Sequence, residues 1–184
     1  NNKEFDQYLK RFSYTFKNEI NDLGGYTILK NKKIILAADI GSSPNKIFSN
    51  EYQAGALSFE IFSNNKKLIS NAGYYSDKSN KLNKLSRSTA LHNALTIEDY
   101  SSCNFKKDQS NLIINKGLKV SKKKIVFENN YWKISGTHDG YLVNFGTSYE
   151  REIEFYPEQM KFIGYDKLFR KKPDKEIKFD IRFH

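Results

Sequence analysis

The hydrophobic pattern of the chain changes from helical to strand-like near residue 24. Between residues 4 and 20, apolar side chains recur at spacings of three and four with charged residues between them, which predicts one N-terminal amphipathic helix. Gly24-Gly25 should end this segment, because glycine readily takes the positive φ of a helix C-cap or turn. From Tyr26 onward the period is two or the apolar runs are short, so the rest of the chain is predicted to be mainly β.

Clusters of Asn, Gly, Asp, Ser and Lys divide the β region into about twelve candidate strands. No helical segments are expected between them to carry parallel crossovers, so the strands should form a large antiparallel β-sandwich. Asn64-Asn65 and Asn129-Asn130 are predicted hairpin turns. Two long polar connections, 39–53 and 72–90, interrupt the pattern and are candidates for functional loops. The predicted strands are 26–30, 33–38, 55–62, 66–71, 91–97, 112–119, 123–128, 131–137, 141–147, 150–156, 160–169 and 176–183.

The charge of the chain narrows the choice of partner. There are 31 basic and 21 acidic residues, a formal net charge of +10, and 26 of the basic residues are Lys against 5 Arg. A surface-wide coding bias toward Lys and a polyanion-binding face both stay open, and either should attract an acidic partner. Nucleic acid is not expected, because the basic residues are dispersed and there is no RNP stretch, helix-turn-helix or Cys/His finger.

Several other classes of protein do not fit the sequence. No run approaches 18 consecutive apolar residues, so no membrane span is expected. Cys103 is the single cysteine, which excludes an intrachain disulfide framework and predicts an unreactive thiol. No Gly-rich phosphate-binding motif appears, so no nucleotide cofactor is implied.

Five blocks of sequence carry a family resemblance over about residues 24 to 184. They are AGALSFEI at 54–61, KLISNAG at 67–73, RSTALHNALTIED at 87–99, THDGY with YEREI at 137–141 and 149–153, and FDIRFH at 179–184. In this order they resemble the C-terminal β domain of the heparinase II/III-like polysaccharide lyases. The RST-x-x-HN-x-L-T block is the most specific of them.

The resemblance implies part of a two-part enzyme. An α/α toroid should precede the β domain, with residues 1–23 as a linker helix from that missing toroid and 24–184 as the sandwich. The alternation of the last predicted strand continues to His184 without a turn, which indicates that the sandwich is cut at its C-terminus. The implied chemistry is β-elimination at a uronic acid residue, which needs a neutralised carboxylate, a base and an acid around a weakly acidic C5 proton. Because the toroid supplies much of this, the isolated chain is expected to be inactive. The implied location is the cell envelope or periplasm, with the cytoplasm left open.

The family's site residues carry over only in part. An H-x-H-x-D stretch precedes the LSFE-like strand in characterised lyases, its first His catalytic and its second a metal ligand; here these positions are Glu51 and Gln53. A metal-binding Asp is replaced by Asn71, and only the third ligand is kept, as His92. One imidazole with neutral amides is a poor zinc site, so no cofactor is expected and His92 would bind metal only in a vestigial site.

The remaining candidates have both functional and structural interpretations. Glu51 could replace the missing base, while His92, Gln53, Asn71, Tyr52 and Arg87 are candidate contacts to an acidic polysaccharide. His92 falls on the less apolar face of the predicted strand 91–97, which fits either a cleft residue or a hydrogen-bonded histidine.

Two other polar residues are expected to be structural. His138 should be bonded at a strand end, and Arg151 should form a semi-buried ion pair.

Two functions therefore stand. In one, the parent protein is a lyase whose sandwich lines the groove; in the other, the domain is a non-catalytic glycan-binding or architectural module of the cell envelope that has lost its metal and acid/base residues. The substitutions at Glu51, Gln53 and Asn71 favour the module, and the retained His92 favours the enzyme.

Overall fold

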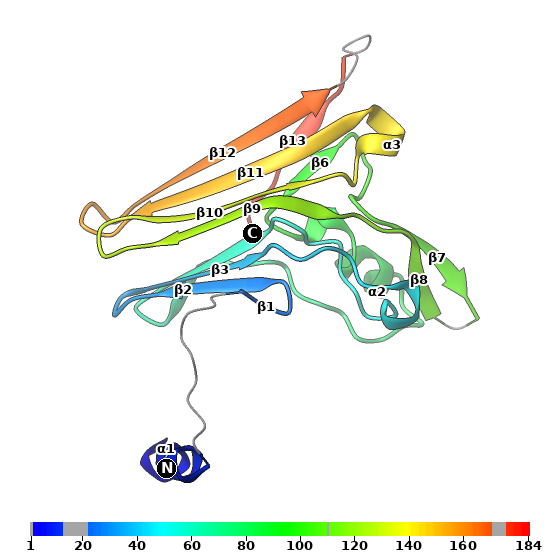
Figure 1. The fold of residues 1–184 in the computed structure, drawn as a ribbon. Coiled ribbons are helices and arrows are strands. Elements are labelled where there is room, and N and C mark those ends of the chain that lie inside the picture. Colours follow the sequence, from blue (N-terminus) through cyan, green and yellow to red (C-terminus); the bar gives the residue numbers. More distant parts are fainter. Residues whose placement is uncertain (1, 13–21, 110, 171–175) are drawn as a thin grey trace.

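The computed structural model describes residues 2–12, 22–109, 111–170 and 176–184, and within them the chain is an antiparallel β-sandwich (Figure 1). One main sheet has the order β1 (Asp22–Leu23), β2 (Tyr26–Lys30), β3 (Ile34–Asp39), β4 (Phe59–Ser63) and β5 (Lys66–Ile69). The other has the order β12 (Lys161–Arg170), β11 (Thr147–Tyr156), β10 (Trp132–His138) and β9 (Val120–Phe127).

Two small sheets and short helices complete the fold. β13 (Phe179–Ile181) pairs with β6 (Leu95–Ile97), and β7 (Asn104–Asp108) pairs with β8 (Asn111–Lys116). The helices are α1 (Asn2–Arg11), α2 (Lys81–Ser86) and α3 (Leu142–Phe145), with 3-10 turns η1 (Lys46–Phe48) and η2 (Thr89–Leu91). The predicted fold class is thus confirmed.

The core lies between the two main sheets because their strands alternate buried and exposed positions. Every second residue of β2 and of β11 is buried. Leu29 and Leu36 of the first sheet and Trp132 and Phe155 of the second are at most 2% exposed, and the two aromatic rings pack edge to face at 4.8 Å.

Both predicted hairpins are present. Asn64 and Asn65 join β4 to β5 with φ of 48° and 63°, the left-handed conformation that a tight hairpin turn needs. At the second turn, the Glu128 amide donates to the Tyr131 carbonyl at 3.0 Å, and Phe127 faces Trp132 across β9 and β10.

Several predicted strands are wrong in part. Residues 141–147 contain α3, since Gly146 takes a left-handed C-cap with φ 62° and its amide donates to the Leu142 carbonyl at 2.9 Å. The strand predicted at 55–62 begins only at Phe59, because Leu57 has a positive φ of 64°. Only 95–97 of the strand predicted at 91–97 is a strand, so the parity assigned to His92 does not apply.

Several elements of the structure were not predicted, among them α3 and the two 3-10 turns. α2 lies within the connection 72–90, where Asn80 caps it by accepting from the Leu82 amide at 2.9 Å. β7 and the two-residue β1 are also additional to the predicted set. The twelve strands expected become thirteen within the described residues.

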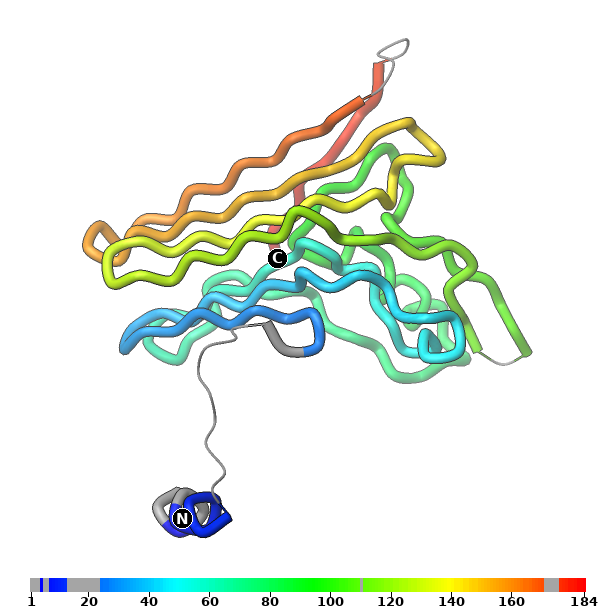
Figure 2. Tube along the Cα trace, viewed as in Figure 1, coloured from blue at the N-terminus to red at the C-terminus, as the bar shows by residue number. Residues whose placement is uncertain are grey.

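The two ends of the chain differ in their relation to the sandwich. The helix predicted over 4–20 is present as α1, which Figure 1 shows away from the sheets, while residues 13–20 of that prediction lie outside the described residues. The last residues return to the sandwich (Figure 2), where the Ser70 amide donates to the His184 carbonyl and the His184 amide to Oδ1 of Asn93. No helix among the described residues has the length and apolarity needed to cross a bilayer.

Candidate functional site

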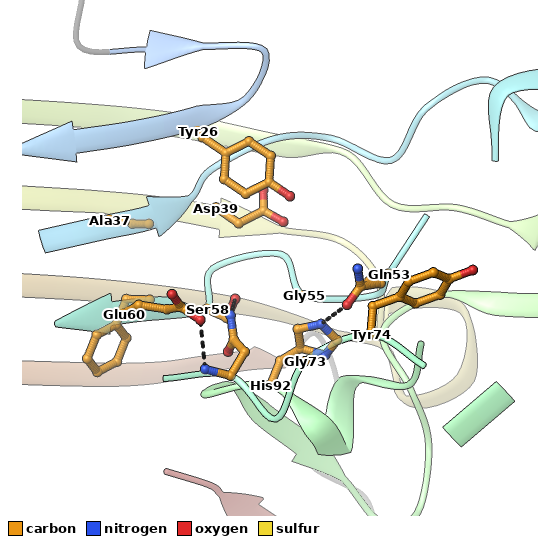
Figure 3. A pocket seen from close by; sticks show the side chains of 13 residues that line it. Tyr26, Ala37, Asp39, Gln53, Gly55, Ser58, Glu60, Gly73, Tyr74 and His92 are labelled. Carbon is orange, nitrogen blue, oxygen red and sulfur yellow. Dashed lines mark hydrogen bonds between the residues drawn. The ribbon is translucent and has the colours of Figure 1, made fainter. Parts of the chain in front are cut away.

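A cavity of about 300 Å³ opens beside the first sheet and holds three of the predicted site residues (Figure 3). His92, Gln53 and Asn71 come from three separate connections and all line it. The other lining residues are Tyr26, Ala37, Ala38, Asp39, Gly55, Ser58, Phe59, Glu60, Gly73 and Tyr74. The resemblance selected these three positions, and although they are spread from residue 53 to residue 92, they are adjacent in space.

His92 is held in one orientation at the wall of this cavity. Its side chain is 5% exposed, and Nδ1 lies 2.8 Å from the Ser88 carbonyl oxygen, which can only accept. The neutral imidazole therefore carries its proton on Nδ1 and leaves Nε2 as an acceptor; the Gln53 side-chain amide, 3.3 Å away, donates to Nε2 when its NH2 group rather than its oxygen is turned toward the ring. Burial lowers the pKa of His92, which favours this neutral form.

The amide that replaces a metal-binding carboxylate takes part in internal hydrogen bonds. Oδ1 of Asn71 accepts from the Asn93 amide at 2.8 Å, and Nδ2 donates to the Ser58 hydroxyl at 3.4 Å. The Asn71 backbone amide donates to Oε1 of Glu60 at 2.9 Å. Asn71 thus joins the wall of the cavity to the segment that follows His92.

A zinc ion does not fit these residues. Zinc in proteins is held by thiolates, imidazoles and carboxylates in tetrahedral sets. Within the described ranges, no three His, Cys, Asp or Glu side chains are grouped so that they could hold a metal ion. The single imidazole faces Gln53, and the Asn71 oxygen is already bonded to a backbone amide.

The cavity is acidic, which the sequence analysis missed. Asp39 and Glu60 both line it, and none of the described lining residues is a lysine or an arginine. Burial raises the pKa of Asp39 to about 6, against the opposing effects of the Gly41 amide and of Lys123. The sequence carried one signal for this acidic lining, since the carboxylate of Asp39 directly follows the apolar run 34–38.

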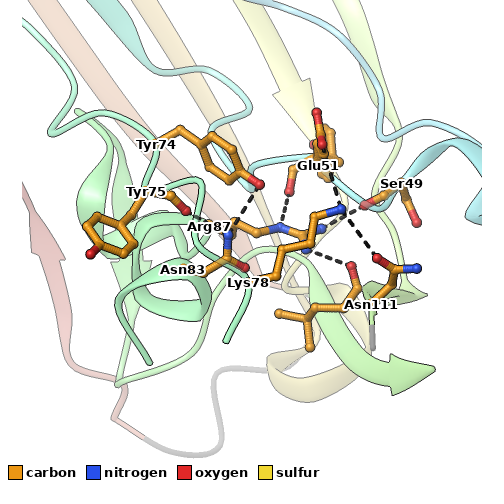
Figure 4. Close-up of polar contacts among 10 residues, drawn as sticks. Ser49, Glu51, Tyr74, Tyr75, Lys78, Asn83, Arg87 and Asn111 are labelled. Carbon is orange, nitrogen blue, oxygen red and sulfur yellow. Dashed lines mark hydrogen bonds and ion pairs between the residues drawn. The ribbon is translucent and has the colours of Figure 1, made fainter. Parts of the chain in front are cut away.

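Arg87 does not line the cavity and is 1% exposed. Figure 4 shows the hydrogen bonds of its side chain. Its guanidinium donates to three backbone carbonyls: Nε to Tyr52 at 2.7 Å, Nη1 to Leu112 at 2.6 Å and Nη2 to Ser49 at 2.7 Å. The same group lies 4.6 Å from the centre of the Phe105 ring. The predicted contact between Arg87 and a substrate therefore does not fit this structure, because its donors are used inside the protein.

Glu51 and Tyr52 also lie outside the cavity lining. The Glu51 side chain is 66% exposed and its carboxylate lies 3.7 Å from Nζ of Lys78, so the predicted base is a surface group apart from His92. Tyr52 is half-buried against the core, with its hydroxyl 3.9 Å from Sγ of Cys103. Burial raises the pKa of the Tyr52 hydroxyl and raises that of the Cys103 thiol to about 12, which fits an unreactive cysteine.

Residues 87–92 and 49–55 interlock, and this contact sets the geometry of the cavity. The Ala54 amide donates to the Arg87 carbonyl at 2.9 Å, and Oγ1 of Thr89 donates to the Ala54 carbonyl at 2.8 Å. The Ser88 carbonyl, between those two residues, orients His92. The R-S-T-x-x-H spacing thus fixes His92 against the segment that carries Gln53.

His138 and Arg151 occupy the core, as expected for structural residues. Nδ1 of His138 accepts from the Gly140 amide at 3.1 Å, and burial lowers the pKa of this histidine to about 3. Arg151 is 3% exposed and forms an ion pair with Asp166 at 2.7 Å. Arg151 also donates to the Leu57 and Asn93 carbonyls, so it ties the second sheet to the turn beside the cavity.

Comparison with known proteins identifies the domain. A model of the family described as heparinase II/III-like, C-terminal, matches residues 21–184. The chain belongs to this family. The predicted resemblance is thereby confirmed, and the interlocked segments around His92 lie within the matched residues.

Two solved structures share the fold. The heparan sulfate lyase HepC from Pedobacter heparinus matches with a TM-score of 0.61 and 17% identity, and a mutant of that lyase matches with 0.62 and 15%. Each match covers 92% of this chain but 27% of the lyase chain, so the chain spans about a quarter of the length of those proteins. No curated protein matches the chain.

Proposed function

We propose that this chain is the β-sandwich portion of a polysaccharide lyase-like protein that cleaves acidic, uronate-containing polysaccharide by β-elimination. The catalytic toroid would lie outside residues 1–184, in keeping with the small share of the lyase chains that the fold covers. The observation that carries the proposal is His92, kept in the family's most specific block and placed in the wall of an open cavity.

The chemistry of His92 suits such a role. Its neutral form offers the Nε2 lone pair at the cavity side, where it can accept a hydrogen bond from a sugar hydroxyl or take up a proton. Because the ring is oriented by the Ser88 carbonyl, it loses little freedom when a substrate binds. It would act beside a base and an acid that the toroid supplies.

The carboxylates of the polymer are expected to bind outside the His92 cavity. Asp39 and Glu60 repel a carboxylate inside the cavity, so the uronate carboxylate is expected to face the toroid or lysines outside the cavity. The net charge of +10 attracts the polyanion over a longer range. By the same resemblance, we propose the cell envelope or periplasm as the location of the parent protein.

The decisive experiment uses the full-length parent protein. Incubation with a panel of uronate polymers should produce the ultraviolet absorbance of the unsaturated sugar, whereas residues 1–184 alone should produce none. Absence of that absorbance with every polymer would remove the enzymatic proposal, and activity of the 184-residue chain alone would show that the toroid is not needed.

The second candidate is a glycan-binding or architectural module. Its support is the replacement of a metal-type ligand by Asn71, whose side chain is committed to Asn93 and Ser58. A full-length protein that binds uronate polymer and yields no unsaturated product would establish this function instead.

A further inference from the structure

A second cavity, of about 230 Å³, is lined in part by Ser88 of the block 87–92. Ser88 lines this cavity, while His92, bonded to the Ser88 carbonyl, lines the first. The walls of the second cavity come from the end of α2, the segment 99–105, the last residue of β8 and the turn that leads into α3. We call it the Lys84–Lys116 cavity after its two cations.

The walls of this cavity are closely fitted. A Cβ on Gly140 would lie 2.5 Å from the Ser102 carbonyl oxygen, so glycine lets the turn before α3 approach the segment 99–105. The Phe105 ring packs against the Arg87 guanidinium, which lies 4.6 Å from the ring centre. Tyr100 packs edge to face against Phe145 at 5.3 Å. The cavity is therefore formed by packed elements rather than by one loop.

The charge of the lining is opposite to that of the first cavity. Lys84 and Lys116 contribute two cations and Asp99 one carboxylate. Within the described residues, neither lysine has an ion pair or a side-chain hydrogen bond. Two ammonium groups without partners at a concave surface favour an anionic ligand.

The remaining lining groups suit a sugar ring. The Tyr100 side chain is 53% exposed and offers an aromatic face to the apolar side of a pyranose. Asn104 and Asn144 each carry an amide that can both donate to and accept from hydroxyl groups. Cations, amides and an aromatic ring together match a sugar that bears hydroxyls and an acid group.

We propose that the Lys84–Lys116 cavity binds an acidic pyranose residue, carrying a carboxylate or a sulfate, of the polysaccharide. This inference rests on the proposed function for the identity of the polymer, and it assigns the polymer's charged groups to a different place from the acidic cavity of His92. The two cavities would then contact different parts of the glycan, and the block 87–92 contributes one lining residue to each, His92 to the first and Ser88 to the second.

The test is binding of uronate oligosaccharides to the 184-residue chain, followed by NMR and calorimetry. Amide signals of Tyr100, Asn104 and Asn144 should shift, and the affinity should fall by about tenfold or more in the double variant K84Q/K116Q, the loss expected for a charge-assisted hydrogen bond. The double variant K30Q/K66Q removes the same charge from exposed lysines of β2 and β5, and its affinity should stay within about twofold of the parent's.

Four outcomes would overturn the inference. They are equal loss of affinity in both double variants, equally tight binding of a neutral oligosaccharide, equal competition by single-stranded DNA of the same charge, and binding that shifts only signals around His92. The last outcome would leave the proposed function standing, because that function depends on the His92 cavity and on product formation by the full-length protein.

Discussion

Gly55 and His92 are in direct contact, although they are 37 residues apart: a Cβ on Gly55 would lie 2.6 Å from Cδ2 of the imidazole and 3.1 Å from Nε2. The backbone at Gly55 therefore packs directly against the imidazole ring. The contact with Gly55 and the hydrogen bond to the Ser88 carbonyl together hold the ring in one orientation at the cavity wall. Glycine at this position allows the histidine to lie where it does.

Gly55→Ala should displace the imidazole. The added methyl overpacks the contact, so the free energy of unfolding should fall by about 1–3 kcal/mol and the NMR signals of the His92 ring should shift. Gly164→Ala is the matched control, since a Cβ there meets nothing within 4 Å, and it should change neither quantity. Equal behaviour of the two variants would show that Gly55 does not seat the ring.

Arg87→Ala should be among the most destabilising single changes in the chain. It would leave one buried and two partly buried carbonyls without their donor, and the free energy of unfolding should fall by about 3 kcal/mol or more in urea titration. Arg87→Lys should recover part of the loss, because an ammonium cannot reach all three carbonyls as the planar guanidinium does. Arg182→Ala, which removes an exposed ion pair, should cost at most about 1 kcal/mol. Similar effects of Arg87→Ala and Arg182→Ala would contradict this role.

Acid should destabilise the fold through His138. The pKa of this histidine is about 3 in the folded state and 6.5 without the fold, so between these values the unfolded chain binds more protons and stability falls as the pH falls. The loss should be on the order of a few kcal/mol and should be complete near pH 3. His138→Asn, which keeps an acceptor for the Gly140 amide, should show a shallower decline in pH-dependent urea unfolding, whereas His184→Gln should follow the parent. Superimposable profiles for His138→Asn and the parent would refute the assignment.

Asp39 should act in the opposite direction. Its pKa is raised from 3.8 to about 6, so the folded state binds more protons between these values and the contribution of Asp39 to stability falls as the pH rises. Asp39→Asn keeps an oxygen for the Gly41 amide and removes the buried charge. Its stability relative to the parent should therefore increase between pH 4 and pH 6, by roughly 1–3 kcal/mol. A constant difference across that range would contradict the raised pKa.

Much of the fold could be predicted because the core is built from regular alternation. The buried positions of β2 and β11 follow period two, and the Asn pairs at 64–65 and 129–130 mark the hairpins. The pattern failed where local backbone geometry overrides it. Gly146 ends a helical turn inside 141–147, and the positive φ of Leu57 delays the start of β4.

The site was predictable only for residues adjacent to the interlocked blocks. His92, Gln53 and Asn71 come together because Thr89 and Arg87 bind the backbone around Ala54, which a motif can indicate. The burial of the Arg87 guanidinium could not be predicted from residue spacing, because it depends on backbone carbonyls of Ser49, Tyr52 and Leu112, which are distant in sequence. The acidic lining by Asp39 and Glu60 depends on β3 and β4 lying side by side at the cavity, a tertiary relationship.

The most direct test of the account is the initial rate at which the full-length protein forms unsaturated product, measured for the parent and for His92→Ala on the same uronate polymer. Loss of a group that exchanges a proton or a hydrogen bond in the transition state should lower kcat/KM by about 10²-fold or more. Gly164→Ala in the same protein should leave the rate unchanged. A parent that forms no product on any uronate polymer, or a His92→Ala variant within about twofold of the parent's kcat/KM, would contradict the account.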